Sequence, residues 1–200
     1  MTGRTCERVR LVRLDAFGGV EAMHASYVTQ TFSRHTHERY AVGCIEAGAM
    51  GFRYLGAGHV AAAGQVNLVV PGEVHDGHAA IPAGWRYRMF YLPPETLDEA
   101  AKGLCGAAGE PRFTQGVIDD PDLAAWLRAT HAAVMDPGIG ALEKQTRLLG
   151  LVAAWVRRHA EAGGEPRTPR PENRAAALAR DYLLAHLAED PGLDDVAAAS

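Results

Sequence analysis

Up to residue 93, the apolar positions of the chain lie in short runs rich in Val, Tyr, Phe and Thr, and glycine or proline separates one run from the next. Such runs are typical of strands in an antiparallel sheet. They predict strands over residues 25–32, 40–45, 50–55, 59–61, 66–70 and 85–92. Gly48, Gly56 and Gly58 can supply the positive φ angles that tight turns need. Many short strands without an intervening helix indicate a closed barrel or jelly roll of roughly eight strands.

After Pro94 the apolar period lengthens from two residues to about 3.6, the period of an α-helix. The pattern predicts a short helix over 96–105 and longer helices over 121–135 and 142–159. The last of these carries an apolar stripe made by Leu148, Leu151, Val152, Trp155 and Val156. The stripe is compatible with two roles, because it can cover the barrel or form the contact of a homodimer through residues 142–159.

Residues 163–171 contain two glycines and three prolines, a composition that predicts a linker. The predicted fold class is therefore α+β. A domain over 1–162 consists of the barrel (1–93) and its helices (94–162), and a second helical segment over 172–200 follows the linker. The length of 200 residues fits about one to one and a half domains.

Composition and charge narrow the class of protein. The chain is 48% hydrophobic and 22% charged, which excludes disorder as its main state. Its net charge of −4 argues against strong nucleic-acid binding by these residues alone, because such binders need a basic face. Cys6, Cys44 and Cys105 form no CxxC pair, so a reducing cytoplasm is expected. The N-terminal residues show neither an export signal nor a membrane anchor.

Three histidines of the predicted barrel are candidates for a binding site. His35 and His37 are two residues apart, so both imidazoles leave the same face of an extended backbone, and His75 follows a turn at Pro71-Gly72. Together they can hold a divalent metal such as zinc and leave a position open for water or ligand. Equally, each can be a lining residue that is hydrogen-bonded to a neighbour. The other histidines of this region are expected to be ordinary residues: His24, His59 and His78.

The spacing His35-x-His37, followed by Pro71-Gly72-x-x-His75, resembles the two motifs of the cupin superfamily, whose histidines line the inside of a small jelly-roll barrel. Metal-binding cupins usually add a glutamate five residues after the second histidine. That position is Val42 here, and Glu46 is misplaced for the role. The resemblance therefore implies a cupin-like barrel in which a metal is not required.

A more specific resemblance covers most of residues 32–91, through the segments 32–40, 43–48, 64–76 and 84–91. This pattern is similar to the N-terminal effector-binding domain of AraC/XylS-family transcription regulators. The resemblance implies a protein that is not an enzyme and that binds a small-molecule effector inside its barrel.

The C-terminal residues carry an independent resemblance. Leu178, Tyr182 and Leu183 share one face of a predicted helix, Pro191-Gly192 ends it, and a second helix begins near Asp194. This order resembles the opening of the AraC-family DNA-binding domain, which continues with a helix-turn-helix. The recognition helix that contacts the bases would follow Ser200, so we expect the chain to be a piece of a longer protein. DNA would then be a partner of the full-length protein only.

The pocket wall is expected to draw on polar and aromatic residues of the strands, namely His35, His37, Tyr40, Tyr54, His75, Trp85, Arg86, Tyr87 and Arg88. Arg86 and Arg88 share one face of their strand, and Trp85 and Tyr87 share the other. The sequence does not decide which face looks inward. Inward arginines would favour an anionic effector, and inward aromatic rings would favour a sugar or an aromatic ring.

The leading hypothesis is a cytoplasmic ligand sensor of a transcription regulator, joined to a DNA-binding domain and not attached to a membrane. The alternative is a cupin metalloenzyme, an isomerase or oxygenase, whose metal is held by His35, His37 and His75. A third class is a stand-alone binding module. Bound metal and turnover would favour the enzyme, and a basic helix beyond Ser200 would favour the regulator.

Overall fold

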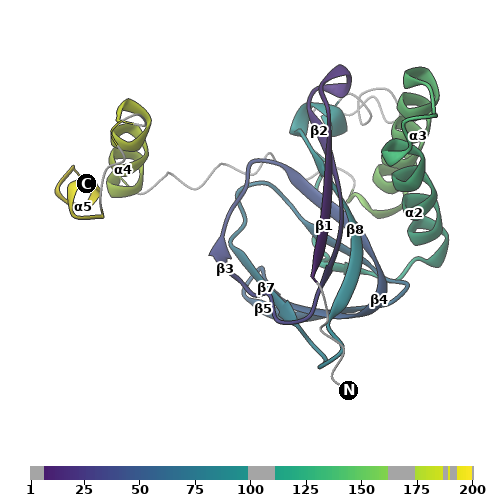
Figure 1. Ribbon diagram of the computed structural model, residues 1–200, viewed down its shortest axis with the longest axis horizontal. Coiled ribbons are helices and arrows are strands. Elements are labelled where there is room, and N and C mark those ends of the chain that lie inside the picture. Colours follow the sequence, from purple (N-terminus) through teal and green to yellow (C-terminus); the bar gives the residue numbers. More distant parts are fainter. Residues whose placement is uncertain (1–6, 99–110, 162–173, 187–188, 190–192, 200) are drawn as a thin grey trace. The chain divides into compact units, whose positions relative to one another are not determined.

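The computed structural model describes residues 7–98, 111–161, 174–186, 189 and 193–199. The chain divides into two compact units, Met1–Gly164 and Glu165–Ser200, and each is considered by itself (Figure 1). The predicted linker over 163–171 lies outside the described residues.

The first unit is built on antiparallel strands. Its strands are β1 (Arg8–Leu14), β2 (Val20–Tyr27), β3 (Phe32–His35), β4 (Tyr40–Tyr54), β5 (Ala57–Ala62), β6 (Val66–Val69), β7 (His75–Ala79), β8 (Trp85–Leu92) and β9 (Val117–Ile118). A 3₁₀ turn, η1 (Asp15–Phe17), joins β1 to β2. The main sheet has the order β1-β2-β8-β4-β6-β9, while β4 also pairs with β5 and β7, and β7 pairs with β3. Because β4 belongs to both groups of strands, the sheet curves into a barrel-like shell (Figure 1).

Strand β4 runs through the turn that the sequence predicts at Gly48. The predicted strands over 40–45 and 50–55 are one strand of 15 residues. A β-bulge between Ile45 and Ala47 bends it, and Gly48 follows with a φ of 72°. The turn lies further along, where Leu55 and Gly56 have φ angles of 51° and 79° and connect β4 to β5. Two successive positive φ angles are typical of a type I′ hairpin.

The barrel is open along one side. Among the described residues, β1 pairs with β2 alone and β3 pairs with β7 alone. The predicted closed barrel is therefore not complete. The apolar pattern also predicted no strand at β1, β7 or β9. The strand predicted over 25–32 lies too late in the chain, because the corresponding strand, β2, ends at Tyr27. The run over 85–92 is a strand with the predicted limits, β8.

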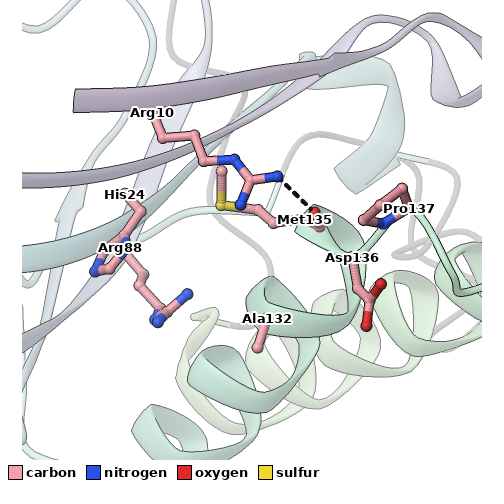
Figure 2. A pocket seen from close by; sticks show the side chains of 7 residues that line it. All are labelled: Arg10, His24, Arg88, Ala132, Met135, Asp136 and Pro137. Atoms are coloured by element: carbon pink, nitrogen blue, oxygen red, sulfur yellow. Dashed lines mark hydrogen bonds between the residues drawn. The ribbon is translucent and has the colours of Figure 1, made fainter.

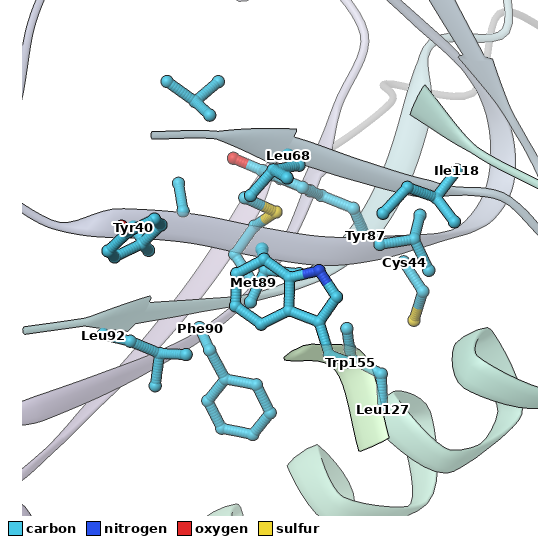
Figure 3. Packing of buried hydrophobic residues seen from close by; sticks show 14 of the residues in the cluster. Tyr40, Cys44, Leu68, Tyr87, Met89, Phe90, Leu92, Ile118, Leu127 and Trp155 are labelled. Atoms are coloured by element: carbon cyan, nitrogen blue, oxygen red, sulfur yellow. The ribbon is translucent and has the colours of Figure 1, made fainter. Parts of the chain in front are cut away.

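Two helices cover the outer face of the main sheet (Figure 1). They are α2 (Pro121–Met135) and α3 (Ala141–His159), as the helical period predicts. Phe90 and Leu92 of β8 point toward these helices, and the apolar stripe of α3, with Trp155, packs there (Figure 3). The predicted helix over 96–105 is described up to residue 98, and residues 94–98 are helical. The second unit contains α4 (Arg174–Ala185) and α5 (Leu193–Ala199).

Candidate functional site

The three predicted histidines converge where β3 pairs with β7. His35 ends β3, His37 follows it, and His75 begins β7 opposite His35. The ring centroids of His35 and His75 are 4.3 Å apart, those of His37 and His75 are 4.7 Å apart, and those of His35 and His37 are 6.2 Å apart. His35 is exposed, His37 is half-buried and His75 is buried, so the cluster extends from solvent into the protein.

Backbone carbonyls fix the tautomers of two of these rings. His35 Nδ1 donates to Ser33 O at 2.7 Å, and His75 Nδ1 donates to Glu73 O at 3.0 Å. Since a carbonyl can only accept, the hydrogen lies on Nδ1 and the Nε2 lone pair is available to a ligand. Burial lowers the pKa of both His37 and His75, and it therefore favours the neutral imidazoles that metals and hydrogen-bonding ligands require.

The donor chemistry of the cluster suits a metal better than its present geometry does. Three imidazoles are a common ligand set for zinc, and in two of these rings, His35 and His75, the Nδ1 atom is bonded to a carbonyl so that Nε2 is available. Nevertheless, no group of three His, Cys, Asp or Glu within the described residues has the arrangement of a metal site. Val42, which occupies the position of the usual cupin glutamate, is buried on the outer face, where it pairs with Phe90.

Aromatic rings continue the cluster along the inner face of the sheet. Tyr27 lies 5.2 Å from Trp85 and 6.1 Å from Tyr87 between ring centroids, and Phe32 lies 6.5 Å from His35. Tyr91 reaches the other end of the cluster, 5.9 Å from His37. Burial raises the pKa of Tyr91 to about 12, so its phenol stays protonated at neutral pH. The inner face beside the histidines is thus mainly aromatic, and Glu21, which pairs with Tyr91 in the sheet, is balanced by Arg39 at 3.7 Å.

One polar atom of this inner face has no protein partner. Trp85 is buried, with 2% of its surface exposed, and its indole Nε1 donor has no hydrogen-bond acceptor among the described residues. Leaving a buried donor unpaired costs about 1–3 kcal/mol, so a ligand that accepts a hydrogen bond from Trp85 would gain affinity from it.

The structure also decides which face of β8 looks inward. Trp85 and Tyr87 look inward, whereas Arg86 and Arg88 look outward and bind Glu46 at 3.2 and 2.5 Å. Two further predicted wall residues lie elsewhere. Tyr40 is on the outer face, 6.1 Å from both Phe113 and Trp155, and the hydroxyl of Tyr54 accepts a hydrogen bond from Val70 N.

Three aromatic residues of this face are not among the predicted wall residues, namely Tyr27, Phe32 and Tyr91. Alternation along β8 could have identified Tyr91, because it lies on the same strand face as Trp85 and Tyr87. Tyr27 and Phe32 reach the site through strand pairing, for which the sequence offers no signal.

Comparison with known proteins agrees with this fold. Residues 17–152 match the family described as the AraC-like ligand binding domain. This match spans more than half of the chain, which therefore belongs to that family and is an AraC-type ligand-binding domain of a transcription regulator. Within the described residues, no helix is long and apolar enough to cross a membrane.

Two particular proteins are similar to the chain over nearly its whole length. An uncharacterized HTH-type transcriptional regulator of Bacillus subtilis, YbfI, is 27% identical over 195 residues, which cover 94% of this chain and 67% of that protein. The crystal structure of the AraC-like transcriptional activator CuxR matches with a TM-score of 0.56 and 13% identity, and the match covers 95% of this chain and 69% of that one.

Proposed function

We propose that a small, neutral, ring-containing effector binds on the inner face of the shell, between the three histidines and the aromatic cluster. The proposal rests mainly on the indole Nε1 of Trp85, a buried donor without a hydrogen-bond partner among the described residues, on a ring that contacts Tyr27 and Phe32. Aromatic faces and neutral donors favour a sugar or an aromatic ring over an anion. The outward direction of Arg86 and Arg88 supports the same choice.

A divalent metal such as zinc is a second candidate ligand of the same region. His35, His37 and His75 would hold it, and when bound it would supply a Lewis-acidic contact for an effector oxygen. No metal is required for the aromatic part of the site. The cupin enzyme of the alternative hypothesis is not favoured, because the family is one of regulators and because Val42 replaces the usual carboxylate.

In the proposed regulator, the effector changes how a DNA-binding domain is presented. Such coupling requires that the effector bind two states of the protein with different affinities. The second unit, with α4 and α5, would be the start of that DNA-binding domain. The resemblance of residues 174–200 to the opening of such a domain supports this part of the proposal.

The proposal predicts that Trp85 contributes directly to effector affinity. The chain would be tested by thermal shift against monosaccharides, hydroxybenzoates and zinc chloride, because a ligand that binds only the folded state raises its stability. Trp85→Phe keeps an aromatic ring but loses the N–H, and we expect it to weaken binding of the stabilising organic compound about fivefold to tenfold.

Trp126→Phe is the matched control, because Trp126 lies on α2 and is 40% exposed. It should leave the affinity unchanged. Equal affinities of the parent protein and the Trp85→Phe variant would contradict the proposed site. Binding of zinc alone would instead assign the histidines as a metal site without an organic effector.

A further inference from the structure

A second cleft lies on the opposite face of the main sheet, outside the shell. Arg10 on β1, His24 on β2 and Arg88 on β8 are in register on adjacent strands, so their side chains form one row on the outer face. The C-terminal end of α2 faces this row with Ala132, Met135 and Asp136, followed by Pro137 (Figure 2). The cleft has a volume of about 360 Å³, which is enough for a small metabolite.

A buried polar network fixes the strand wall of this outer cleft. Glu46, next to the bulge of β4, accepts from His24 at 2.9 Å and from Arg88 at 2.5 Å. Arg88 also donates to Nδ1 of His131 at 3.3 Å, and His131 Nε2 donates to Met23 O at 3.1 Å. Burial and the neighbouring Arg88 lower the pKa of His131 to about 4, so this ring stays neutral. The guanidinium of Arg88 is therefore held in place from two sides.

The two walls of the outer cleft have opposite charge. The strand wall carries Arg10 and Arg88, and Glu46 binds Arg88 beside it, so the wall has an excess of one positive charge. The helix wall carries the carboxylate of Asp136 and the negative end of the α2 dipole. Asp136 is exposed and lines the cleft, and its Oδ1 accepts a hydrogen bond from Gly138 N at 2.8 Å, which orders the side chain.

The arginines of the cleft have donors left for a ligand. In the part of the chain that the structure describes, Arg10 donates one hydrogen bond, to Met135 O at 3.1 Å, and Arg88 donates to Glu46 and His131. Each guanidinium has five N–H donors, and a carboxylate is the group that pairs best with this planar fork. A cationic group would find its partner on the opposite wall, at Asp136.

We infer that the outer cleft is a second ligand site, separate from the barrel interior, and that it binds a small zwitterion of the amino-carboxylate class. The carboxylate lies against Arg10 and Arg88, and the ammonium group lies against Asp136. A ligand in this position contacts three strands and the end of α2 together, so it tightens the packing of the helix on the sheet. None of this depends on an effector in the barrel.

The inference is tested by isothermal titration calorimetry of the whole 200-residue chain at constant ionic strength. Three probes of similar length distinguish the contribution of the carboxylate from that of the ammonium group. γ-Aminobutyrate carries one of each, succinate carries two carboxylates, and butylamine carries only the ammonium group. We expect saturable binding of γ-aminobutyrate and binding at least about tenfold weaker for the other two. Succinate that binds as tightly as γ-aminobutyrate, or no saturable binding of γ-aminobutyrate, overturns the inference.

Two substitutions place the binding in the outer cleft. Arg10→Gln should weaken γ-aminobutyrate about tenfold. Arg8→Gln is the matched control, because Arg8 lies on the same strand and the same outward face without lining the cleft, and it should have no effect. Ala132→Leu keeps all charges and fills the cleft from an exposed helical position, so it should also abolish binding. Equal losses with Arg8→Gln and Arg10→Gln, or full binding by Ala132→Leu, overturn the assignment.

Discussion

Asp120 joins the two covering helices by one side chain. It is the N-cap of α2, where its carboxylate accepts from Leu123 N at 2.9 Å, and it also binds Arg158 and His159 at the end of α3. The hydrogen bond from Leu123 and those from His159 and Arg158 lower the pKa of Asp120 to about 2. Because the folded pKa lies below the unfolded value, this stabilisation is present above about pH 4 and is lost as the pH falls toward 2.

We therefore expect Asp120→Ala to lower the free energy of unfolding by about 1 kcal/mol at pH 7, the usual contribution of an N-cap. The cost should shrink as the pH falls through the titration of Asp120. Urea unfolding followed by circular dichroism, at neutral pH and at about pH 3, measures both effects. Asp119→Asn is the control, because Asp119 is exposed and precedes the cap, and it should change little. A cost of Asp120→Ala that is independent of pH would contradict the ionic part of this explanation.

Single residues also show what the sequence could and could not predict about the sites. The HxH spacing and the later His75 were sufficient to predict that three imidazoles converge, because alternation and the cupin pattern both place them on one face. His24 was predicted to be an ordinary residue, yet its side chain binds Glu46 and lines the outer cleft. That role depends on the register of β1, β2 and β8, which no local pattern encodes.

At the scale of elements, β4 contains glycines at which the neighbouring strands leave no room for a side chain, and Gly48 is one of them. A Cβ atom on Gly48 would overlap the carbonyl oxygen of Gly84, whereas a Cβ atom on Gly56 would meet no atom within 4 Å. Both residues have positive φ, so alanine strains the backbone at either position by about 1–2 kcal/mol. At Gly48 the overlap with a neighbouring strand adds about 1–3 kcal/mol.

The difference between the free energies of unfolding of Gly48→Ala and Gly56→Ala therefore measures the cost of placing a side chain where a neighbouring strand lies close to β4. We expect Gly48→Ala to be the more destabilising by about 2 kcal/mol in urea unfolding. Equal losses would show that the backbone at residue 48 relaxes and that β4 tolerates a side chain where it crosses from one group of strands to the other.

The elements predicted best are those in which the apolar pattern continues over many residues and capping or proline residues mark the ends. Helix α2 has the predicted limits because Asp120 and Pro121 mark its start and a continuous period of 3.6 fills it. Strand β1 escaped prediction because arginines alternate with its apolar residues, and Val9 and Leu11 remain 54% exposed. The bulge at Ile45 and Ala47 made one strand look like two.

At the scale of the whole molecule, the inner and outer faces of the sheet carry different kinds of side chain. The inner face is aromatic and carries the histidines, while the outer face carries the charged row and the helices. The sequence predicted a barrel with covering helices but not its open side, because β1 and β3 are edges only through their pairing partners. At the β3 edge, His35 of the proposed effector site is exposed to solvent.

Homodimerisation through residues 142–159 remains a prediction, and the structure narrows which residues would carry it. The buried stripe of α3 faces the sheet, so a partner would contact the opposite side of the helix. Leu142 and Leu149 are seven residues apart on that side and are 77% and 42% exposed.

We expect Leu149→Glu to convert a dimer into a monomer in sedimentation-velocity experiments, because a carboxylate buried in an apolar contact is strongly unfavourable. The thermal stability of each monomer should change little, since the side chain is already partly exposed. Leu11→Glu, at an exposed leucine on β1, is the matched control and should leave the dimer intact. If Leu149→Glu still forms a dimer, the contact does not involve this face of α3. If the parent chain sediments as a monomer, these 200 residues do not dimerise by themselves.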